Sequence, residues 1–378
     1  MSEPRKLSLL DHFSSLEDPR IDRTKRHDLL DIVVISICAV ICGMESWVDM
    51  EDFGEGRKEW FKKFLKLPNG IPSHDTFRRV FSLLSAEQFQ QCFQSWVRAV
   101  CEAVDKDVVA IDGKTLRRSF DKTAAQPPLH LVSAWSSANS LVLGQVAVES
   151  KSNEIVAIPK LLELLDITGC IVTIDAMGCQ KEIAKQITAN GGNYVFCLKE
   201  NHPNLYNEVK DFFNSDNTIK DTNIHQTTDC NHGRIEVRKY ISASAKGFEH
   251  ASAWKGIESV GMIESKREIN GEVSLEKRYY ISSLESNAER FGKAVRTHWQ
   301  IENSLHWVLD VVFNEDQCRI RDKHAAENFA LLRRMAIGLL KNEKSSKKSI
   351  RRKKNQASWD DEYLLRVLQA NVSVSSTC

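Results

Sequence analysis

The sequence predicts an α/β fold in which a mixed sheet with flanking helices carries a β-rich insertion and follows an all-helical domain. Apolar residues recur at helical spacing up to about residue 105, after which short apolar strands alternate with helices. Two of these strands, at 108–112 and 171–175, each end in an aspartate. Alternating strands and helices are typical of a sheet that helices cover.

The composition places the chain among ordinary globular proteins. Its 378 residues exceed one compact core, and 52 Lys plus Arg against 51 Asp plus Glu leave its overall charge near neutral. Ten cysteines without a Cys-x-x-Cys pair, and no recognisable signal peptide, favour reduced thiols in the cytoplasm. The most apolar run, 32–42, is shorter than the roughly 20 residues that cross a bilayer, so we expect no membrane segment.

Four segments are expected in order along the chain. They are a polar arm at 1–28, a helical domain at 29–105, a sheet domain at 106–340 and a basic tail with a short helix at 341–378. Within the helical domain, Ser85 followed by Gln88 is the pattern of a helix-capping box. Within the sheet domain, Asn270-Gly271 is a strong hairpin signal, and we expect a strand insertion at about 230–285.

Three acidic residues form the candidate site. Asp112 and Asp175 end apolar strands, where ligands bind in α/β sheets, and Glu302 lies on a later helix. Each alone is also explained as a turn former or a solvated side chain. Together they are what a ribonuclease H-like core needs, because carboxylate oxygens are ligands for Mg²⁺ and two ions can assist phosphoryl transfer. We therefore predict that all three are catalytic and bind Mg²⁺, with Mn²⁺ as an alternative.

The helix that bears Glu302 is expected to run from about 287 to 312. Its polar residues recur every four positions: His298, Glu302, His306 and Asp310. We expect His298 and His306 to orient phosphate or Glu302, unless they are inert surface histidines. Trp299 and Trp307 flank this stripe, and we expect them to fill the core rather than to pack on bases.

Basic residues near the acids are candidates for DNA phosphate contacts, although each is also explained as a solvated charge. The candidates, with one histidine, are Lys114, Arg117, Lys199, Arg234, Arg238 and His298. The basic run at 341–354 is either a disordered DNA-gripping tail or a solubilising one. No phosphate-binding glycine loop and no nucleophile elbow is present, and Cys230 with His232 lacks a second pair for zinc.

These residues lie in motifs that resemble the DDE transposases of bacterial insertion sequences, in particular the H-repeat-associated (ISAs-type) group. The matching stretches are AIDGKTLRRS at 110–119, TIDAMGCQ at 173–180, YVFCLKENHPNLY at 194–206, HGRIEVR at 232–238, HWQIENSLHWVLDVVFNEDQCRIR at 298–321 and NFALLRRMAIGLL at 328–340. The resemblance implies that the three acids are metal ligands. It also implies a strand insertion before the glutamate and a transposase-associated helical domain.

The resemblance further implies metal-dependent cleavage and strand transfer at insertion-sequence ends. The expected partners are double-stranded DNA, as terminal inverted repeats and target, and a second copy of the chain on that DNA. The expected location is the cytoplasm, at the nucleoid. One departure is that Val295, His298 and Leu309 stand where related enzymes often have Tyr, Arg and Lys. A ribonuclease H-like nuclease without strand transfer and a non-catalytic DNA-binding protein remain the alternatives.

Overall fold

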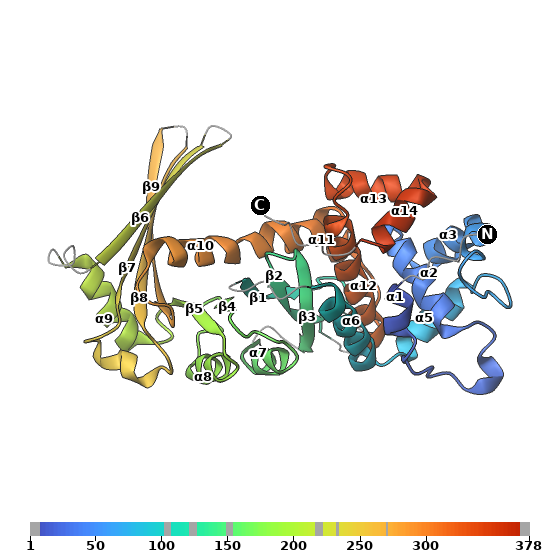
Figure 1. Ribbon diagram of the computed structural model, residues 1–378, viewed down its shortest axis with the longest axis horizontal. Coiled ribbons are helices and arrows are strands. Elements are labelled where there is room, and N and C mark those ends of the chain that lie inside the picture. The colour runs from blue at the N-terminus through green and yellow to red at the C-terminus, as the bar shows by residue number, and fades with distance from the viewer. Residues whose placement is uncertain are drawn as a thin grey trace. The chain divides into compact units, whose positions relative to one another are not determined.

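The computed structural model describes residues 8–101, 107–120, 127–148, 154–215, 222–231, 234–269 and 271–370 (Figure 1). The chain divides into two compact units. Unit 1 contains Met1–Val104, Gly113–Lys151 and Glu302–Cys378, and unit 2 contains Asp105–Asp112 and Ser152–Ile301. The division falls directly after Asp112 and directly before Glu302. Some predictions concern residues outside the described ranges, namely 1–7 of the arm, 371–378 of the tail, His232 and Gly233 of one motif, and Asn270 of the hairpin turn.

Unit 1 begins with a helical region. Its helices are α1 (Ser8–Phe13), α2 (Leu29–Ile41), α3 (Trp47–Gly56), α4 (Lys58–Phe61), α5 (His74–Leu83) and α6 (Ala86–Val100). The Asp28 side chain begins α2 by accepting a hydrogen bond from the Leu30 N–H at 3.0 Å. Ser85 begins α6 in the same way, with the Gln88 N–H at 3.3 Å, so this half of the predicted capping box is present.

Phenylalanines on one face of α5 and one face of α6 form the core of this region. Phe77, Phe81, Phe89 and Phe93 have no exposed surface. The rings of Phe81 and Phe89 meet edge to face with centroids 6.0 Å apart, and Trp47 of α3 stacks on Phe81 at 5.3 Å. The helical spacing read from the sequence is therefore confirmed by the inward face that it predicts.

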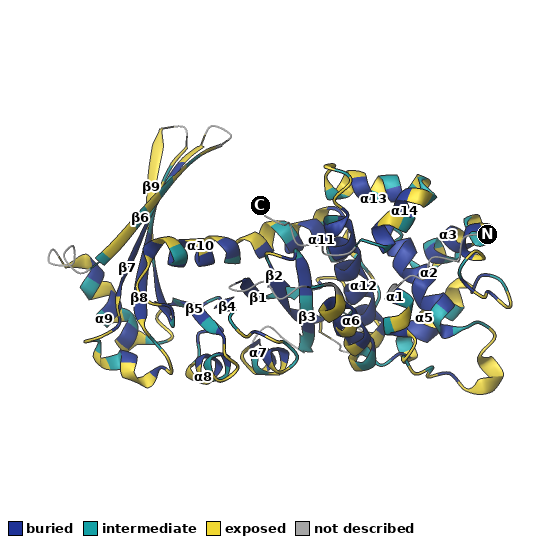
Figure 2. Cartoon of the chain, viewed as in Figure 1, coloured by how far each residue is buried: buried dark blue, intermediate teal, exposed yellow. Residues whose placement is uncertain are grey.

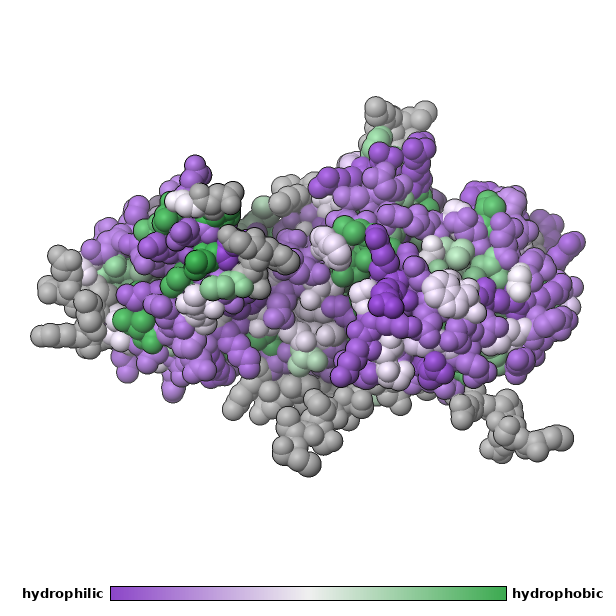
Figure 3. Space-filling model, turned by 90° about the horizontal axis from the view of Figure 1, so that it is seen from above, coloured by the Kyte–Doolittle hydropathy of each residue, from purple (hydrophilic) through white to green (hydrophobic). Residues whose placement is uncertain are grey.

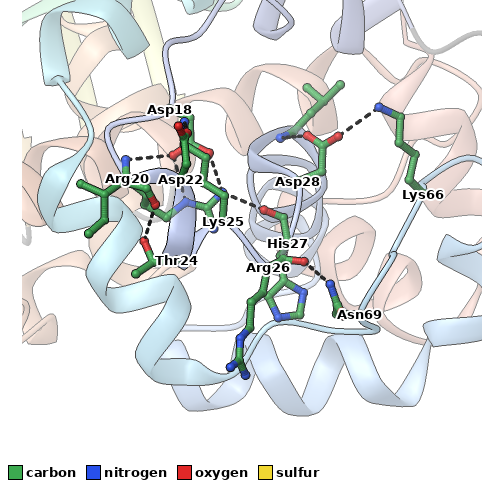
Figure 4. Close-up of polar contacts among 12 residues, drawn as sticks. Asp18, Arg20, Asp22, Thr24, Lys25, Arg26, His27, Asp28, Lys66 and Asn69 are labelled. Carbon is green, nitrogen blue, oxygen red and sulfur yellow. Dashed lines mark hydrogen bonds and ion pairs between the residues drawn. The ribbon is translucent and has the colours of Figure 1, made fainter.

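The described part of the expected polar arm is packed onto the helices. Leu9 and Phe13 of α1 are buried. Arg20, only 7% exposed, pairs with Asp18 at 2.7 Å and also donates to the His27 carbonyl (Figure 4). A short 3₁₀ turn, η1 (Asp22–Thr24), follows. The Asn69 amide donates to the Arg26 carbonyl, and the Lys66 ammonium lies 3.1 Å from the Asp28 carboxylate (Figure 4). The last two contacts hold residues 26–28 against the 66–70 loop.

Helix α12 (Lys323–Asn342) is buried along most of its length and is dark blue there in Figure 2. It packs against α2, α5 and α6 and against β3 (Leu141–Val148), which pairs antiparallel with β2 (His130–Ser136). The Asn328 amide donates to the Phe81 and Leu84 carbonyls at 3.2 and 3.0 Å. This buried side chain therefore satisfies the open end of α5. Before α12 come α11 (Trp307–Val311) and η6 (Glu315–Gln317).

The basic tail is folded in its described part, so it is not the disordered tail that was one of the two expectations, and it contains the expected short helix. Helices α13 (Ile350–Trp359) and α14 (Asp361–Leu368) follow α12. Lys353 is 5% exposed, and its ammonium donates to the carbonyls of Leu340 and Glu343. The Tyr363 hydroxyl lies 2.9 Å from the Glu343 carboxylate. Lysine thus caps the end of α12, where unpaired carbonyl groups favour a cation.

Unit 2 is built on a mixed sheet. Strand β1 (Val108–Thr115), which crosses the unit division, pairs in parallel with β4 (Ile171–Ile174), and β4 pairs in parallel with β5 (Asn193–Leu198). Helices α7 (Glu154–Glu163), α8 (Lys181–Ala189) and α9 (Pro203–Asn214) lie between or after these strands. In unit 2 the order is β1-β4-β5-β9-β8-β7-β6. The predicted class, a mixed sheet with flanking helices after a helical region, is confirmed.

The β-rich insertion is a four-stranded antiparallel ribbon. Its strands are β6 (Thr222–Asn231), β7 (Arg234–Ser244), β8 (Ser259–Ile269) and β9 (Glu272–Ser282), with η4 (Glu249–Ala253) between β7 and β8. The predicted hairpin joins β8 and β9, where Gly271 adopts a φ of +84°. The ribbon starts at Thr222, before the expected 230, because β6 is an edge strand whose polar residues give no apolar alternation.

Helix α10 (Ala288–His298) packs on one face of this sheet. Phe291 and Val295 of the helix join Tyr240, Ile263 and Tyr280 of the strands in one buried cluster. Gly292 allows this close approach, since a Cβ there would lie 2.8 Å from the Tyr240 ring. None of the helices in the described ranges is long and apolar enough to cross a bilayer.

Candidate metal and nucleic-acid site

Asp112 and Asp175 occupy matching places on neighbouring parallel strands of unit 2. Ile111 of β1 is in register with Ile174 of β4, so the next residue on each strand is an aspartate. Parallel strands lie about 4.8 Å apart, which brings the two carboxylates to the same edge of the sheet. Asp112 does not end β1, as the sequence suggested, because the strand continues to Thr115. Its side chain is half-buried, as is that of Asp175.

The Asp175 carboxylate is oriented by the turn that follows β4. Its Oδ1 atom accepts hydrogen bonds from the N–H groups of Met177 at 3.1 Å and Gly178 at 3.2 Å. The Asn201 amide donates to the Ala176 carbonyl at 2.9 Å and holds the same turn from the α9 side. A carboxylate held in this way is preorganised for a ligand, because its orientation is fixed before binding.

Glu302 begins a turn of π-helix in unit 1. Residues Glu302–His306 form this turn, labelled η5, and α11 follows directly. The Glu302 side chain is 54% exposed, and its Oε2 atom lies 3.5 Å from Nδ1 of the buried His306. The helix predicted at about 287–312 is therefore present not as one α-helix but as α10, which ends at His298, the π-turn and α11. Such turns occur frequently at functional sites.

His298 contacts the sheet of unit 2. Its Nδ1 atom lies 3.0 Å from the Thr173 hydroxyl on β4, two residues before Asp175. The sequence assigned His298 to DNA, whereas this contact joins the end of α10 to β4. Trp299 and Trp307 are 44% and 55% exposed, so the expectation that they fill the core is wrong. The Arg278 guanidinium lies 4.7 Å from the centre of the Trp299 ring.

Lys114 is occupied by carboxylates within unit 1. Its ammonium lies 2.7 Å from Asp310 of α11 and 3.6 Å from Asp316 of η6, and its side chain is 10% exposed. A lysine held between two acids is poorly placed to neutralise a phosphate, contrary to the sequence expectation. Arg117 differs, because its side chain is 78% exposed while it pairs with Asp316 at 3.2 Å. Arg117 thus remains available to a polyanion.

The basic residues of unit 2 also divide into engaged and exposed groups. Glu236, only 2% exposed, pairs with Arg238 at 2.5 Å, Arg234 at 3.2 Å and Arg267 at 3.3 Å. Arg238 also pairs with Asp229 and is largely buried, so its predicted DNA contact conflicts with its structural one. Lys199 is exposed directly after β5. Lys199 and Arg117 are therefore the predicted phosphate ligands that are best placed to meet DNA.

The comparisons with known proteins fit this set of residues. Residues 10–97 match the family described as "DDE_Tnp_1-associated", and residues 104–339 match the family described as "Transposase DDE domain". The chain belongs to the DDE transposases. The range 104–339 includes Asp112, Asp175 and Glu302, and the helical region of this transposase falls in the first match.

Related proteins cover nearly the whole transposase. "H repeat-associated putative transposase YhhI" of Escherichia coli (strain K12) is 44% identical over 371 residues, which are 95% of this chain and 97% of that protein. "Putative transposase YncI" of Escherichia coli O157:H7 is 41% identical over 368 residues, covering 96% and 94%. A piggyBac transposase synaptic complex with hairpin DNA is 10% identical with a TM-score of 0.43, covering 98% of this chain and 82% of that one. This last likeness is too weak to inform the site.

The donor atoms of this DDE transposase suit a hard divalent cation. Asp112 and Asp175 present two carboxylates side by side, and Glu302 presents a third that is solvent-exposed. Carboxylate oxygens are the ligands that Mg²⁺ prefers, and Mn²⁺ accepts the same set together with imidazole. From the sequence, His306 was expected to orient phosphate or Glu302, and its i,i+4 spacing from Glu302 was the signal for the observed contact.

Proposed function

We propose that this transposase cleaves and joins DNA strands at insertion-sequence ends, with Asp112, Asp175 and Glu302 as its metal ligands. The observation that carries the proposal is the pair of aspartates at matching positions on parallel strands, in a chain of this family. Divalent ions, Mg²⁺ or Mn²⁺, would supply Lewis-acid assistance to the attacking and leaving oxygens. The protein supplies rigid carboxylates. His306 contacts the Glu302 carboxylate and orients it toward the ion that this carboxylate would bind.

The proposed reaction has two displacements at phosphorus. In the first, a water oxygen attacks the phosphodiester at the element end, and the bond to the 3′ oxygen breaks to leave a 3′ hydroxyl. In the second, this 3′ oxygen attacks a phosphodiester of target DNA and displaces the 3′ oxygen of the target strand. The number of phosphodiester bonds is conserved in the second step, so no external energy source is needed.

Arg117 and Lys199 are proposed to contact the phosphates of double-stranded DNA, both the terminal repeats and the target. Both side chains are exposed, and contacts of this kind position a duplex without reading its sequence. DNA as the substrate places this activity in the cytoplasm, at the nucleoid. Each removed cation is expected to weaken binding of all sequences about equally and to lower the salt dependence by about one charge.

Purified protein incubated with terminal-repeat DNA and Mg²⁺ tests the proposal. We expect Asp112→Asn, Asp175→Asn and Glu302→Gln each to abolish cleavage and to weaken Mn²⁺ binding measured by electron paramagnetic resonance. Glu182→Gln, at an exposed acid of α8, serves as the control and should change neither readout. Cleavage that survives the double change Asp112→Ala and Asp175→Ala would refute the assignment.

The products separate this function from the two alternatives. Joined element–target molecules identify a transposase, whereas cleaved ends without joined products identify a nuclease. A natural chain that binds DNA but does not cleave it is a non-catalytic DNA-binding protein. Cleaved and joined strands are scored on one denaturing gel with labelled element ends, and DNA binding is scored on a native gel.

A further inference from the structure

The first turn of α13 and the segment before it carry a dense group of exposed cations. Five lie within the short range 344–352, in which no Asp or Glu occurs: Lys344, Lys347, Lys348, Arg351 and Arg352. These five residues are called the basic surface here. Figure 3 looks down on the side of unit 1 that carries α13 in Figure 1, and hydrophilic side chains predominate there.

The charges of the basic surface are not balanced by acids of this chain. Among the residues that the structure describes, no carboxylate pairs with any of the five cations, and Lys348 bonds instead to the neutral Gln356 side chain at 2.7 Å. An exposed lysine elsewhere in unit 1, Lys62, does have such a partner, because it lies 2.6 Å from Glu59. The basic surface therefore keeps an unbalanced positive charge, which is what a polyanion requires.

The crowding of these cations acts on the buried lysines behind them. Burial lowers the pKa of Lys341 and of Lys353, and the Lys344 ammonium lowers both further. Burial also lowers the pKa of Lys354, and the Arg351 guanidinium adds to that effect. Like charges at this spacing repel one another, so the arrangement destabilises the free protein. A bound polyanion would relieve this repulsion.

The two arginines occupy the end of α13 where the helix itself favours acids. No acidic residue lies in the first turn, and the Ser349 side chain makes no capping hydrogen bond there. The first turn of a helix has unpaired N–H groups and a partial positive charge, which anions stabilise and cations do not. Phosphate groups bind readily at such an end. Arg351 and Arg352 add charge to this end and so strengthen its preference for a phosphate.

Contacts on the inner side of α13 fix the basic surface to the segment that bears Glu302. The Arg351 guanidinium donates to the Val311 carbonyl at 3.1 Å, and the Lys354 ammonium donates to the Val312 carbonyl at 2.6 Å. Val311 is the last residue of α11, which directly follows the π-turn that Glu302 begins. At a helical rise of about 1.5 Å per residue, Val311 lies about 14 Å along the axis from Glu302. That length is the rise of roughly four base pairs of duplex DNA.

We propose that the basic surface binds the phosphate backbone of double-stranded DNA beside the cleavage site, without reading its sequence. Lysine and arginine neutralise phosphates of any sequence and release the counterions that surround them. A folded helix already holds the charges in place, so less ordering is required on binding than for a disordered tail. The inference rests on the proposed function, since that function makes DNA the substrate and places Glu302 at the cleavage site.

Fluorescence anisotropy of a labelled duplex with the full chain, in the absence of divalent ions, tests the surface. Lys347→Gln combined with Arg352→Gln removes two exposed cations that have no bonded partner among the described residues. We expect this double variant to bind about tenfold more weakly near 0.15 M salt, and the slope of log Kd against log salt to fall by roughly two. A terminal-repeat duplex and an unrelated duplex of equal length should lose affinity equally.

Lys181→Gln combined with Lys185→Gln is the matched control. It removes the same charge from two exposed lysines of α8, which flank the acidic Glu182. The control should change Kd less than about twofold, and both double variants should keep the natural unfolding temperature. Equal losses in the two variants, no loss in the first, or a loss confined to the terminal-repeat duplex overturns the proposal. If the first variant instead loses binding only to phosphatidylglycerol vesicles, the surface faces a membrane and the proposal is wrong.

Hydroxyl-radical footprinting tests the position of the surface on the DNA. Backbone protection that the natural chain gives and the Lys347→Gln, Arg352→Gln variant loses should lie roughly four base pairs from the cleaved bond, and within one turn of the duplex. Protection lost farther away contradicts the placement beside Glu302. Because binding is measured without divalent ions, a natural chain that never cleaves DNA would refute the proposed function and leave the binding result intact.

Discussion

The Lys114 ammonium lies 2.7 Å from the Asp310 carboxylate and so joins the end of β1 to α11. Both groups are mostly buried, and Asp316 adds a second carboxylate at 3.6 Å. Lys114→Met removes the shared cation, and we expect it to lower the free energy of unfolding by about 2 kcal/mol in urea titrations. The salt dependence of DNA binding should not change, because no phosphate contact is lost.

Arg117→Met is the control for this prediction. Arg117 pairs with the same Asp316 but its side chain is 78% exposed, so its loss should cost less than about 0.5 kcal/mol. It should reduce the salt dependence of DNA binding instead. A reduced salt dependence in Lys114→Met would show that Lys114 contacts phosphate after all.

Glu315 makes the stability of unit 1 sensitive to acid. It is fully buried and lies 2.9 Å from Arg334. Burial alone would raise the pKa of Glu315, but Arg334, Arg333 and Lys114 hold it below the ordinary value. The folded pKa is thus lower than the unfolded one, so this stabilisation is present above about pH 4.5 and is lost as pH falls through the folded pKa.

Glu315→Gln should remove that acid dependence and destabilise the protein at neutral pH by about 3–5 kcal/mol, since it leaves Arg334 buried without its counter-ion. Urea unfolding from pH 3 to pH 7 measures both effects. Glu182→Gln, on the surface of unit 2, should keep the natural pH profile. A Glu315→Gln profile parallel to that of the natural protein would contradict the assignment.

Lys341 should give a rise in stability at alkaline pH. Burial lowers the pKa of Lys341 to about 8, and its ammonium lies 4.7 Å from the centre of the Trp135 ring. Between this value and the unfolded value of about 10.5, the unfolded chain binds more protons than the folded one. This group therefore adds stability as pH rises through that window.

The difference between the natural protein and Lys341→Met isolates this contribution. Thermal unfolding at pH 7 and pH 9.5 should show a smaller pH-dependent gain in the variant. Lys347→Met, at an exposed lysine of the same basic run, is the control. Equal gains in all three proteins would mean that Lys341 keeps its proton in the folded state.

Glu236→Gln should destabilise the ribbon locally. The carboxylate is 2% exposed and is paired with Arg238, Arg234 and Arg267. Its removal leaves arginines partly buried without their counter-ion, so amide hydrogen exchange should speed up in β7 and β8. Glu268→Gln, on β8 opposite Ile235, is exposed and should leave exchange unchanged. Unchanged exchange in Glu236→Gln would show that the arginines need no such partner.

Residues next to a clear apolar strand pattern could be assigned to the ends of strands from the sequence. Apolar strands led to Asp112 and Asp175, whereas the parallel register that places them side by side is seen only in the pairing of β1 with β4. Strand β6 gave no such signal because an edge strand exposes polar side chains on both faces. Lys353 could not be placed either, since its burial depends on the end of α12 and on Tyr363 from a later helix.

The segment after Glu302 shows a different limit. Residues four apart face one another in an α-helix, and Glu302 with His306 still do so here, so the pattern concealed the π-turn. Trp299 and Trp307 were expected in the core because tryptophan side chains are on average highly buried. Both side chains are exposed instead, beside the polar stripe that contains Glu302.

In the π-turn, the number of residues matters as well as their chemistry, because that number sets the direction in which the Glu302 side chain points. One residue of a helix corresponds to about 100° of rotation around its axis. Deleting Asn303 would keep every acidic and basic side chain of unit 1, yet it would turn Glu302 by about that angle relative to Asp310. A shortened segment could therefore silence a protein whose carboxylates are all still present.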